Sequence, residues 1–326
     1  MDRLEETDGR PELIALRALK LGDLLVAVPA IHGLRRAHPD HRFVLAVPGW
    51  LEPIVDLIEG VDALLPTPGL DDRLPVAPGR VDIAVNLHGS GPESRRLIDA
   101  LDANTAMVHR VSEIDGVRGG DPRMPAWRDD VSERERWVRL VRAYGVAADS
   151  DDVALLPPAR PPVVVGASVL HVGAFYGSRR WPIDRFAAVA LELHERGHRI
   201  VFTGSAAERD RATAVARTAG LSDESILAGR LDLGEFAAVI ERARLVVSAD
   251  TGAAHLASAY HRPSVVLFGP AAPEHWGPPP GPHAVLTDAS RRRGDTFSDS
   301  PDPALLAVDV PDVLASVERV LGPSRG

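Results

Sequence analysis

The sequence contains no cysteine in its 326 residues. This absence excludes a disulfide framework, a thiolate nucleophile and a cysteine-based zinc site. Lysine is nearly absent as well, because Lys20 is the only lysine among 37 basic residues. Aromatic residues make up 5% of the chain, while 45% of its residues are hydrophobic and 25% are charged. The last two fractions are ordinary for a globular protein that folds around a hydrophobic core.

Long hydrophobic runs are also missing. No run approaches the roughly 20 apolar residues that a membrane-spanning helix needs. The acidic beginning, "MDRLEETDGRPE", has neither the basic start nor the apolar centre of a signal peptide. We therefore expect a cytoplasmic protein without a transmembrane segment, for which peripheral contact with a membrane stays open.

The charge balance is acidic, with 46 acidic and 37 basic residues and a formal net charge of −9. Nucleic acids and anionic membrane surfaces attract electropositive faces, so this balance argues against general affinity for either. A local basic pocket is still compatible with it, and we expect no nucleic-acid partner.

Apolar patterns in the first half alternate between strands and helices, which is typical of a parallel sheet covered by helices. We expect Pro29 to bend or interrupt the first helix early. The expected strands are 12–19, 42–48, 61–66 and 81–89, and the expected helices are 24–38, 51–60, 93–103 and 132–146.

Four prolines among residues 157–162 cannot lie inside a helix or sheet, and they place a domain boundary there. The sequence thus predicts two domains, 1–158 and 159–326. Residues 287–304 are polar and charged, which indicates a flexible surface segment. Packing of the last helix back onto the N-terminal domain stays open. In the second half the expected strands are 168–173, 199–204, 244–249 and 263–269, and the expected helices are 184–197, 207–220, 232–243, 253–260 and 310–322.

Two doubly wound α/β domains in tandem are expected to bind ligands at the carboxyl ends of their strands, in a cleft between the domains. Neither domain contains the G-x-G-x-x-G turn of nicotinamide-binding domains or the G-x-x-x-x-G-K-[ST] loop of P-loop ATPases. The sequence therefore argues against both a nicotinamide-dependent dehydrogenase and a P-loop ATPase.

The first candidate site is "LKLGDLL", where the first strand ends. Gly22 permits a tight turn and Asp23 stands at the entry to the next helix. An ionised Asp23 could act as a general base, or it could only cap the helix. Lys20 lies beside this turn, either facing the cleft or as a lysine on the edge of a loop.

The second candidate is "NLHGSGPES", residues 86–94, at the end of another strand. His88, Gly89 and Ser90 could let an acceptor substrate approach the backbone. An ordinary turn would explain the glycines equally well.

Two further stretches favour an anion site in the second domain. Arg179 and Arg180 follow a small-residue loop and precede a helix, so they could clamp a phosphate or be an exposed basic pair. In "SADTGAAH", a strand ends in Asp250, Thr251 and Gly252 and passes at once into a helix that carries His255. Backbone N–H groups at such a helix start favour an anion. Alternatively, Asp250 caps the helix and His255 lies in the core.

Taken in order, five segments of the chain resemble glycosyltransferase family 9, the ADP-heptose:lipopolysaccharide heptosyltransferases and their relatives. They are "LGDLLVAVPAI", "NLHGSG", "RRWPIDRFAAVA", "GRLDLGEFAAVIERARLVVSADTGAAHLASAY" and "PSVVLFGP…HWGP". The "LGD…P" beginning and the "S-x-DTG-x-x-H-L-A…P-x-V-x-LFGP" ending are the most specific parts.

The resemblance implies the two-domain GT-B architecture, with the acceptor bound mainly by the N-terminal domain and the nucleotide-sugar donor by the C-terminal one. It implies an inverting transferase that needs no metal or other cofactor. In this family Asp23 matches the base that deprotonates the acceptor. Arg179 replaces a frequent lysine that holds the donor diphosphate, and Asp250, Thr251, Gly252 and His255 match the donor-binding turn.

The expected reaction is therefore transfer of a sugar, with heptose from ADP-heptose as the first choice, onto a hydroxyl of a glycan or small-molecule acceptor. A sugar-nucleotide epimerase of similar shape and a non-catalytic sugar-nucleotide-binding protein stay open as alternatives. The acceptor region offers no motif that matches the family residue by residue.

Overall fold

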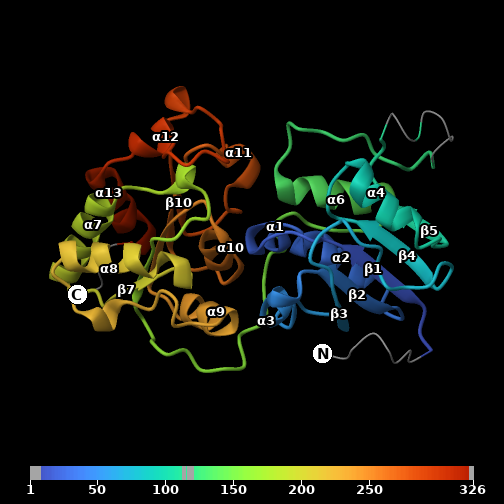
Figure 1. Cartoon of the computed structure of the whole chain (residues 1–326), viewed down its shortest axis with the longest axis horizontal. Helices are drawn as coiled ribbons and strands as arrows, with labels where there is room; N and C mark the ends of the chain where they lie inside the picture. The colour runs from blue at the N-terminus through green and yellow to red at the C-terminus, as the bar shows by residue number, and fades with distance from the viewer. Residues whose placement is uncertain (1–8, 112–114, 116–120, 323–326) are drawn as a thin grey trace. The chain divides into compact units, whose positions relative to one another are not determined.

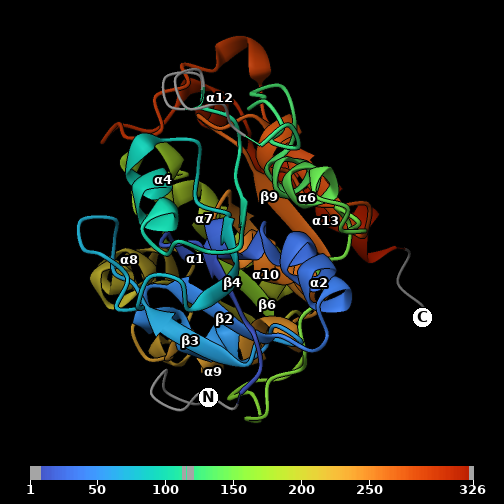
Figure 2. The ribbon, with the colours of Figure 1, turned by 90° about the vertical axis from the view of Figure 1, so that its right-hand side faces the viewer.

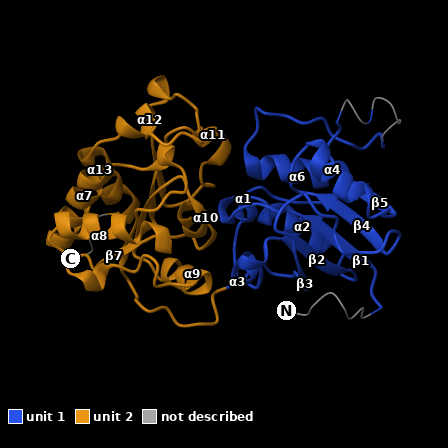
Figure 3. Cartoon of the chain, viewed as in Figure 1, with its two compact units in different colours: residues 1–156 blue, residues 157–326 orange. Residues whose placement is uncertain are grey.

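The computed structural model of the chain (Figure 1) describes residues 9–111, 115 and 121–322. Residues 1–8 of the acidic beginning, on which the signal-peptide prediction rests, lie outside the described residues. The chain divides into two compact units, residues 1–156 and 157–326 (Figure 3). The division falls before Pro157, at the start of the proline cluster, whereas the sequence placed it after residue 158.

The first unit contains a parallel sheet in the order β3-β2-β1-β4-β5, and Figure 2 shows β3 beside β2. All residues of β1 and β2 are buried, as continuous apolar runs in a parallel sheet require. The short edge strand β5 was not expected from the sequence. The strands are β1 Glu12–Leu16, β2 Arg42–Val47, β3 Ala63–Pro66, β4 Val81–Asn86 and β5 Thr105–Met107.

The first expected helix of this unit is divided into two helices near the interruption predicted at Pro29. One helix was expected over residues 24–38, but α1 ends at Leu25 and Pro29 lies in the first turn of α2. Proline is tolerated there because its missing N–H would have no partner in that turn. The helices are α1 Leu21–Leu25, α2 Val28–Ala37, α3 Glu52–Val55, α4 Pro92–Asp99 and α6 Glu133–Ala143.

The second unit contains a parallel sheet in the order β10-β9-β8-β6-β7. Its core includes Trp181, Phe186 and Phe202, all nearly or fully buried. The edge strand β10 was missed by the sequence prediction. The strands are β6 Ser168–His171, β7 Ile200–Thr203, β8 Leu245–Ala249, β9 Ser264–Leu267 and β10 His283–Leu286.

Helices surround this second sheet, and the last of them packs against α7, β9 and β10 of its own unit. No helix in the described part of the chain is both long and apolar enough to span a membrane. The helices are α7 Ile183–Glu195, α8 Arg209–Thr218, α9 Leu233–Glu241, α10 Gly252–Ala259, α11 Pro273–Trp276, α12 Pro303–Leu306 and α13 Val310–Leu321.

Residues 294–302, which we call the strap, belong to the predicted flexible surface segment; most of them are exposed, and they form hydrogen bonds with Ser178. Ser178 donates its backbone N–H to Ser298 O at 2.8 Å and its hydroxyl to Thr296 O at 2.8 Å. Ser178 O accepts from Asp302 N at 3.0 Å. The strap is held in place mainly by these hydrogen bonds, together with a ring contact between Phe297 and Tyr176 at a centroid distance of 5.1 Å.

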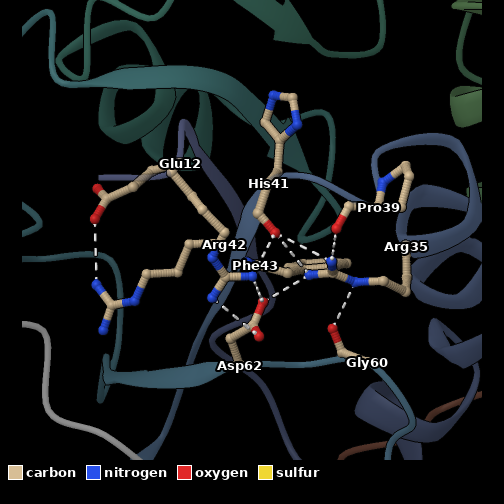
Figure 4. Close-up of polar contacts among 9 residues, drawn as sticks. Glu12, Arg35, Pro39, His41, Arg42, Phe43, Gly60 and Asp62 are labelled. Atoms are coloured by element: carbon tan, nitrogen blue, oxygen red, sulfur yellow. Dashed lines mark hydrogen bonds and ion pairs between the residues drawn. The ribbon is translucent and has the colours of Figure 1, made fainter. Parts of the chain in front are cut away.

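A second polar network ties the amino ends of β2 and β3 together (Figure 4). Arg35 of α2 donates to Asp62 at 2.7 Å, to Gly60 O at 2.8 Å and to the backbone oxygens of Pro39 and His41 at 3.0 Å. One guanidinium therefore satisfies several carbonyl oxygens and one carboxylate at the edge of the sheet away from the strand carboxyl ends.

The neighbouring arginines of α2 give a matched test of this network. We expect Arg35→Met to lower the free energy of unfolding by about 2 to 4 kcal/mol, because it leaves several acceptors without their donor. Arg36 is 56% exposed in its side chain and has an ion pair with Asp152, so Arg36→Met should cost less than about 1 kcal/mol. Urea unfolding of both variants measures the difference, and equal losses would contradict the role given to Arg35.

Candidate functional site

The predicted site residues follow the two strands in each sheet at which the strand order reverses. In the first unit these strands are β1 and β4, followed by Asp23 and His88 respectively; in the second they are β6 and β8, followed by Arg179 and Asp250. Ligands of open α/β sheets bind outside the carboxyl ends of strands at such switch points. Each unit therefore has one candidate site.

Asp23 lies in the short helix α1, but it is not the N-cap residue. Lys20 has that position, and its backbone N–H donates to Asp23 Oδ2 at 3.3 Å. Gly22 precedes the carboxylate in the first turn. The Asp23 side chain is 27% exposed, so a capping bond to one oxygen leaves part of the carboxylate accessible to a substrate.

Arg17 was not among the predicted residues, yet it contacts Asp23 directly. Its side chain is 2% exposed, and its Nε donates to Asp23 O at 2.8 Å. Another guanidinium nitrogen, Nη1, donates to Leu87 O, at the end of β4. The guanidinium carbon lies 4.5 Å from the ring centroid of Trp137 on α6. An arginine that interrupts the apolar run "ELIALRAL" was the signal in the sequence for a buried cation.

His88 follows β4 beside this arginine. Burial, and then the charge of Arg17, lower the pKa of His88 to about 4, so the imidazole is neutral at pH 7. Its Nδ1 has no hydrogen-bond partner among the described residues. Gly89 and Ser90 are half-buried, and an added Cβ at Gly89 would have ordinary contacts only. The turn thus has no steric requirement for glycine at position 89.

An aromatic cluster, which includes Trp137, packs against Arg17. His109 has ring contacts with Trp127 and Trp137 at centroid distances of 5.0 and 5.8 Å. The guanidinium of Arg136 lies 4.1 Å from the Trp127 ring. Burial, followed by the charges of Arg136 and Arg139, lowers the pKa of His109 to about 4. The cluster therefore contains a neutral histidine.

In the second unit the turn Gly177–Arg179 presents Arg179, and the strap fixes this turn. A Cβ on Gly177 would lie 1.8 Å from Asp299 O, so only glycine fits beneath the strap. Arg179 Nε lies 3.6 Å from Asp250 Oδ2 and makes no hydrogen bond to any described residue. The two residues that the sequence assigned to the diphosphate site therefore do lie together.

The turn formed by Asp250, Thr251 and Gly252 contradicts the alternative in which Asp250 caps the helix. Thr251, not Asp250, is the N-cap residue of α10, and its hydroxyl lies 2.8 Å from Ser248 Oγ. Asp250 is 4% exposed and lies between two basic side chains. Its Oδ2 lies 3.6 Å from Arg179 Nε, and its Oδ1 lies 3.8 Å from His255 Nε2. Gly252 begins the helix at the same place. The carboxylate therefore lies between these basic groups, and it does not stand at the N-cap position of the helix.

Arg180 does not join Arg179 at Asp250. It is exposed and donates to Ala174 O at 3.1 Å. Arg211, which the sequence did not single out, is a half-buried neighbour that donates to Val172 O at 2.8 Å. Burial lowers the pKa of Arg211, and the charge of Arg180 adds to this effect.

Metal ligands do not gather at either site. Within residues 9–111, 115 and 121–322, no three His, Cys, Asp or Glu side chains are grouped so that they could hold a metal ion.

Comparison with known proteins connects both units to one family. Residues 159–298 match the model of "Glycosyltransferase family 9 (heptosyltransferase)". Lipopolysaccharide heptosyltransferase 1 of Pseudomonas aeruginosa is 38% identical over 163 residues, which cover 47% of this chain and 43% of that protein. Lipopolysaccharide heptosyltransferase 2 of Salmonella typhimurium is 30% identical over 312 residues, which cover 79% and 82%.

A solved structure matches nearly the whole chain. The E. coli heptosyltransferase WaaC, solved with ADP, superimposes with a TM-score of 0.72 at 18% identity and covers 95% of this chain and 99% of its own. Together with the two parallel-sheet units, this likeness confirms the predicted GT-B α/β fold.

The buried His109 predicts how stability depends on pH. Between pH 6.5 and about 4 the unfolded chain binds a proton at this histidine that the folded chain does not, so stability falls as the pH falls. His109→Phe keeps the ring contacts and removes the titration. It should therefore flatten the dependence of the unfolding free energy in this window, by up to about 1.4 kcal/mol per pH unit.

Chemical denaturation at a series of pH values measures this slope. The matched control is His194→Gln, because His194 is exposed on α7. A slope in His109→Phe equal to that of the unsubstituted protein would contradict the assignment of a neutral buried His109.

Proposed function

The chain belongs to glycosyltransferase family 9, and on that premise we propose that it transfers heptose from ADP-heptose to a hydroxyl of a glycan or small-molecule acceptor. In this proposal the anomeric centre is inverted, and no metal ion or other cofactor takes part. The observation that carries the proposal is the position of Arg179 against Asp250 at the β6–β8 switch point. The names of the relatives, all heptosyltransferases, support heptose as the sugar.

The donor diphosphate interacts with Arg179 in this proposal. Its buried Nε lies beyond hydrogen-bond distance of Asp250, so this donor can bind a phosphate oxygen without breaking a bond to the protein. An arginine in place of the family's frequent lysine keeps the charge and adds a planar group that can bind two oxygens. The WaaC structure with ADP supports adenine as the base.

Asp23 acts on the acceptor. Its carboxylate accepts the proton of the acceptor hydroxyl while that oxygen forms a bond to the anomeric carbon and the bond from this carbon to the diphosphate breaks. ADP leaves with the bonding electrons. Because His88 is neutral at pH 7, it adds no second positive charge beside the carboxylate.

The leaving diphosphate carries the negative charge that a metal ion stabilises in many transferases. Here we assign this task to Arg179 and to the N–H groups at the start of α10, which begins at Gly252 with the positive end of its dipole at the turn. This assignment is the basis for proposing that the reaction is independent of metal.

Nucleotide binding tests the donor. ADP at 100 times its dissociation constant should stabilise the protein by about 2.7 kcal/mol, with or without magnesium, whereas UDP, GDP, dTDP and NAD should have little effect at the same concentration. Melting temperatures measure the gain. Arg179→Met should reduce the gain from ADP strongly, while its exposed neighbour provides the control variant Arg180→Met, which should keep most of it.

A preference for UDP, GDP or dTDP would overturn adenine as the base. Stabilisation that requires magnesium would overturn metal independence, and no response to any nucleotide would favour a protein without this donor site.

Asp23→Asn tests the base. The asparagine keeps an oxygen that can accept from Lys20 N but cannot take a proton, so turnover should fall by at least about 100-fold while ADP affinity stays unchanged. Acceptor-dependent release of ADP from ADP-heptose, with heptose-free lipopolysaccharide as the first acceptor, measures turnover. Substantial turnover in Asp23→Asn would contradict the role, and consumption of ADP-heptose without acceptor would indicate an epimerase.

A further inference from the structure

We propose that Arg17 is a positioning residue for Asp23, which sets the orientation of the carboxylate that receives the acceptor's proton. This inference rests on the proposed function. It comes from the arrangement of a fully buried guanidinium between the ends of β1 and β4, the two strands of the switch point.

The register of the sheet brings Arg17 to this place. Leu16, the last residue of β1, is paired with Asn86, the last residue of β4. The next residues in each strand, Arg17 and Leu87, therefore lie side by side, and Arg17 Nη1 donates to Leu87 O. This bond ties the turn that carries Asp23 to the loop that begins with His88.

The other two nitrogens of the guanidinium face Asp23. Nε donates to Asp23 O at 2.8 Å, and Nη2 lies 3.8 Å from Asp23 Oδ1. The backbone of Asp23 is thus fixed by a hydrogen bond. Its Oδ1 lies near the positive charge of Arg17 but forms no hydrogen bond with this guanidinium. Oδ2 accepts from Lys20 N. The carboxylate is held on both sides and keeps a lone pair for a substrate proton.

Trp137 fixes the plane of the guanidinium. The ring is 1% exposed and lies 4.5 Å from the guanidinium carbon, which is favourable for a cation beside an aromatic face. The planar guanidinium forms these contacts at fixed angles, whereas a lysine ammonium in the same place could not face Asp23 and Leu87 at the same time.

Burying a charged side chain costs free energy unless a partner of opposite charge compensates it. A side chain that only held two strands together would therefore not need to be charged. The neighbouring Glu133 is already paired with Arg136, whose Nε lies 3.0 Å from Glu133 Oε1. Asp23 is therefore the carboxylate that the Arg17 charge faces most directly. This pairing is what distinguishes positioning of the base from simple packing.

The experiment combines substitutions of Arg17 and Asp23. We expect Arg17→Lys to lower kcat by at least tenfold in the acceptor-dependent release of ADP from ADP-heptose, and to change KM for ADP-heptose by less than twofold. In the Asp23→Asn background, Arg17→Lys should cause no further loss, because the group it positions no longer acts as a base. An equal loss in both backgrounds, or an unchanged kcat, would overturn the proposal.

Arg136→Lys is the matched control. Arg136 is also a buried arginine beside a tryptophan ring, but its contacts are with Glu133 and Arg128 O and not with Asp23. Its kcat should stay within twofold of the unsubstituted protein. A loss as large as that of Arg17→Lys would mean that any disturbance of this cluster slows the reaction, which would overturn a specific role for Arg17.

A readout without turnover separates this inference from the proposed function. In a crystal structure of Arg17→Lys, the turn at Gly22 and Asp23 should be displaced relative to the unsubstituted protein, while the turn at Gly177–Arg179 keeps its position. An unmoved Asp23 would overturn the positioning role. If instead the unsubstituted protein releases no ADP from ADP-heptose, the proposed function fails, and the crystal structure still decides the role of Arg17.

Discussion

The parallel pairing of β1 with β4, and of β6 with β8, is the constraint on which both candidate sites depend. All four strands end at the carboxyl edge of their sheets, and the chain order reverses between the members of each pair. Crossovers between parallel strands are right-handed, so the segments that follow the two strands leave to opposite faces of the sheet. Ligands of such sheets bind outside these strand ends, and residues far apart in sequence, such as Asp23 and His88, follow the two strands there.

Arginine performs three different tasks in this nearly lysine-free chain. Arg35 satisfies carbonyl groups at the amino edge of the first sheet, where it stabilises the fold (Figure 4). Arg17 is buried between two strand ends and directs Asp23. Arg179 is partly exposed on a turn, and its Nε is the donor that we propose for a phosphate. The task follows from burial and from the partners of each guanidinium, which residue type alone does not reveal.

The sequence was sufficient for the elements with a long apolar pattern. Arg179 and Asp250 were predicted to share a site and lie 3.6 Å apart. Short edge strands such as β5 and β10 were missed because a few residues carry too little periodicity. Arg17 was missed because its partner Leu87 is distant in sequence and is reached through the sheet register. Capping by Asp250 was an open alternative because aspartate is favoured at helix starts, but Thr251 is the N-cap residue.

The position of the strap depends on main-chain contacts, which the residue types of the segment do not predict. Its contacts with Ser178 and its close approach to Gly177 are made by main-chain atoms of Thr296, Ser298, Asp299 and Asp302. Apart from Asp302, whose carboxylate accepts from Gly294 N and Ala304 N, replacing a side chain of the strap should leave those carbonyl and N–H groups where they are. Removing a single residue would move all of them out of register with the turn that carries Arg179. In the course of evolution, this segment should therefore accept changes of residue type far more readily than changes of length.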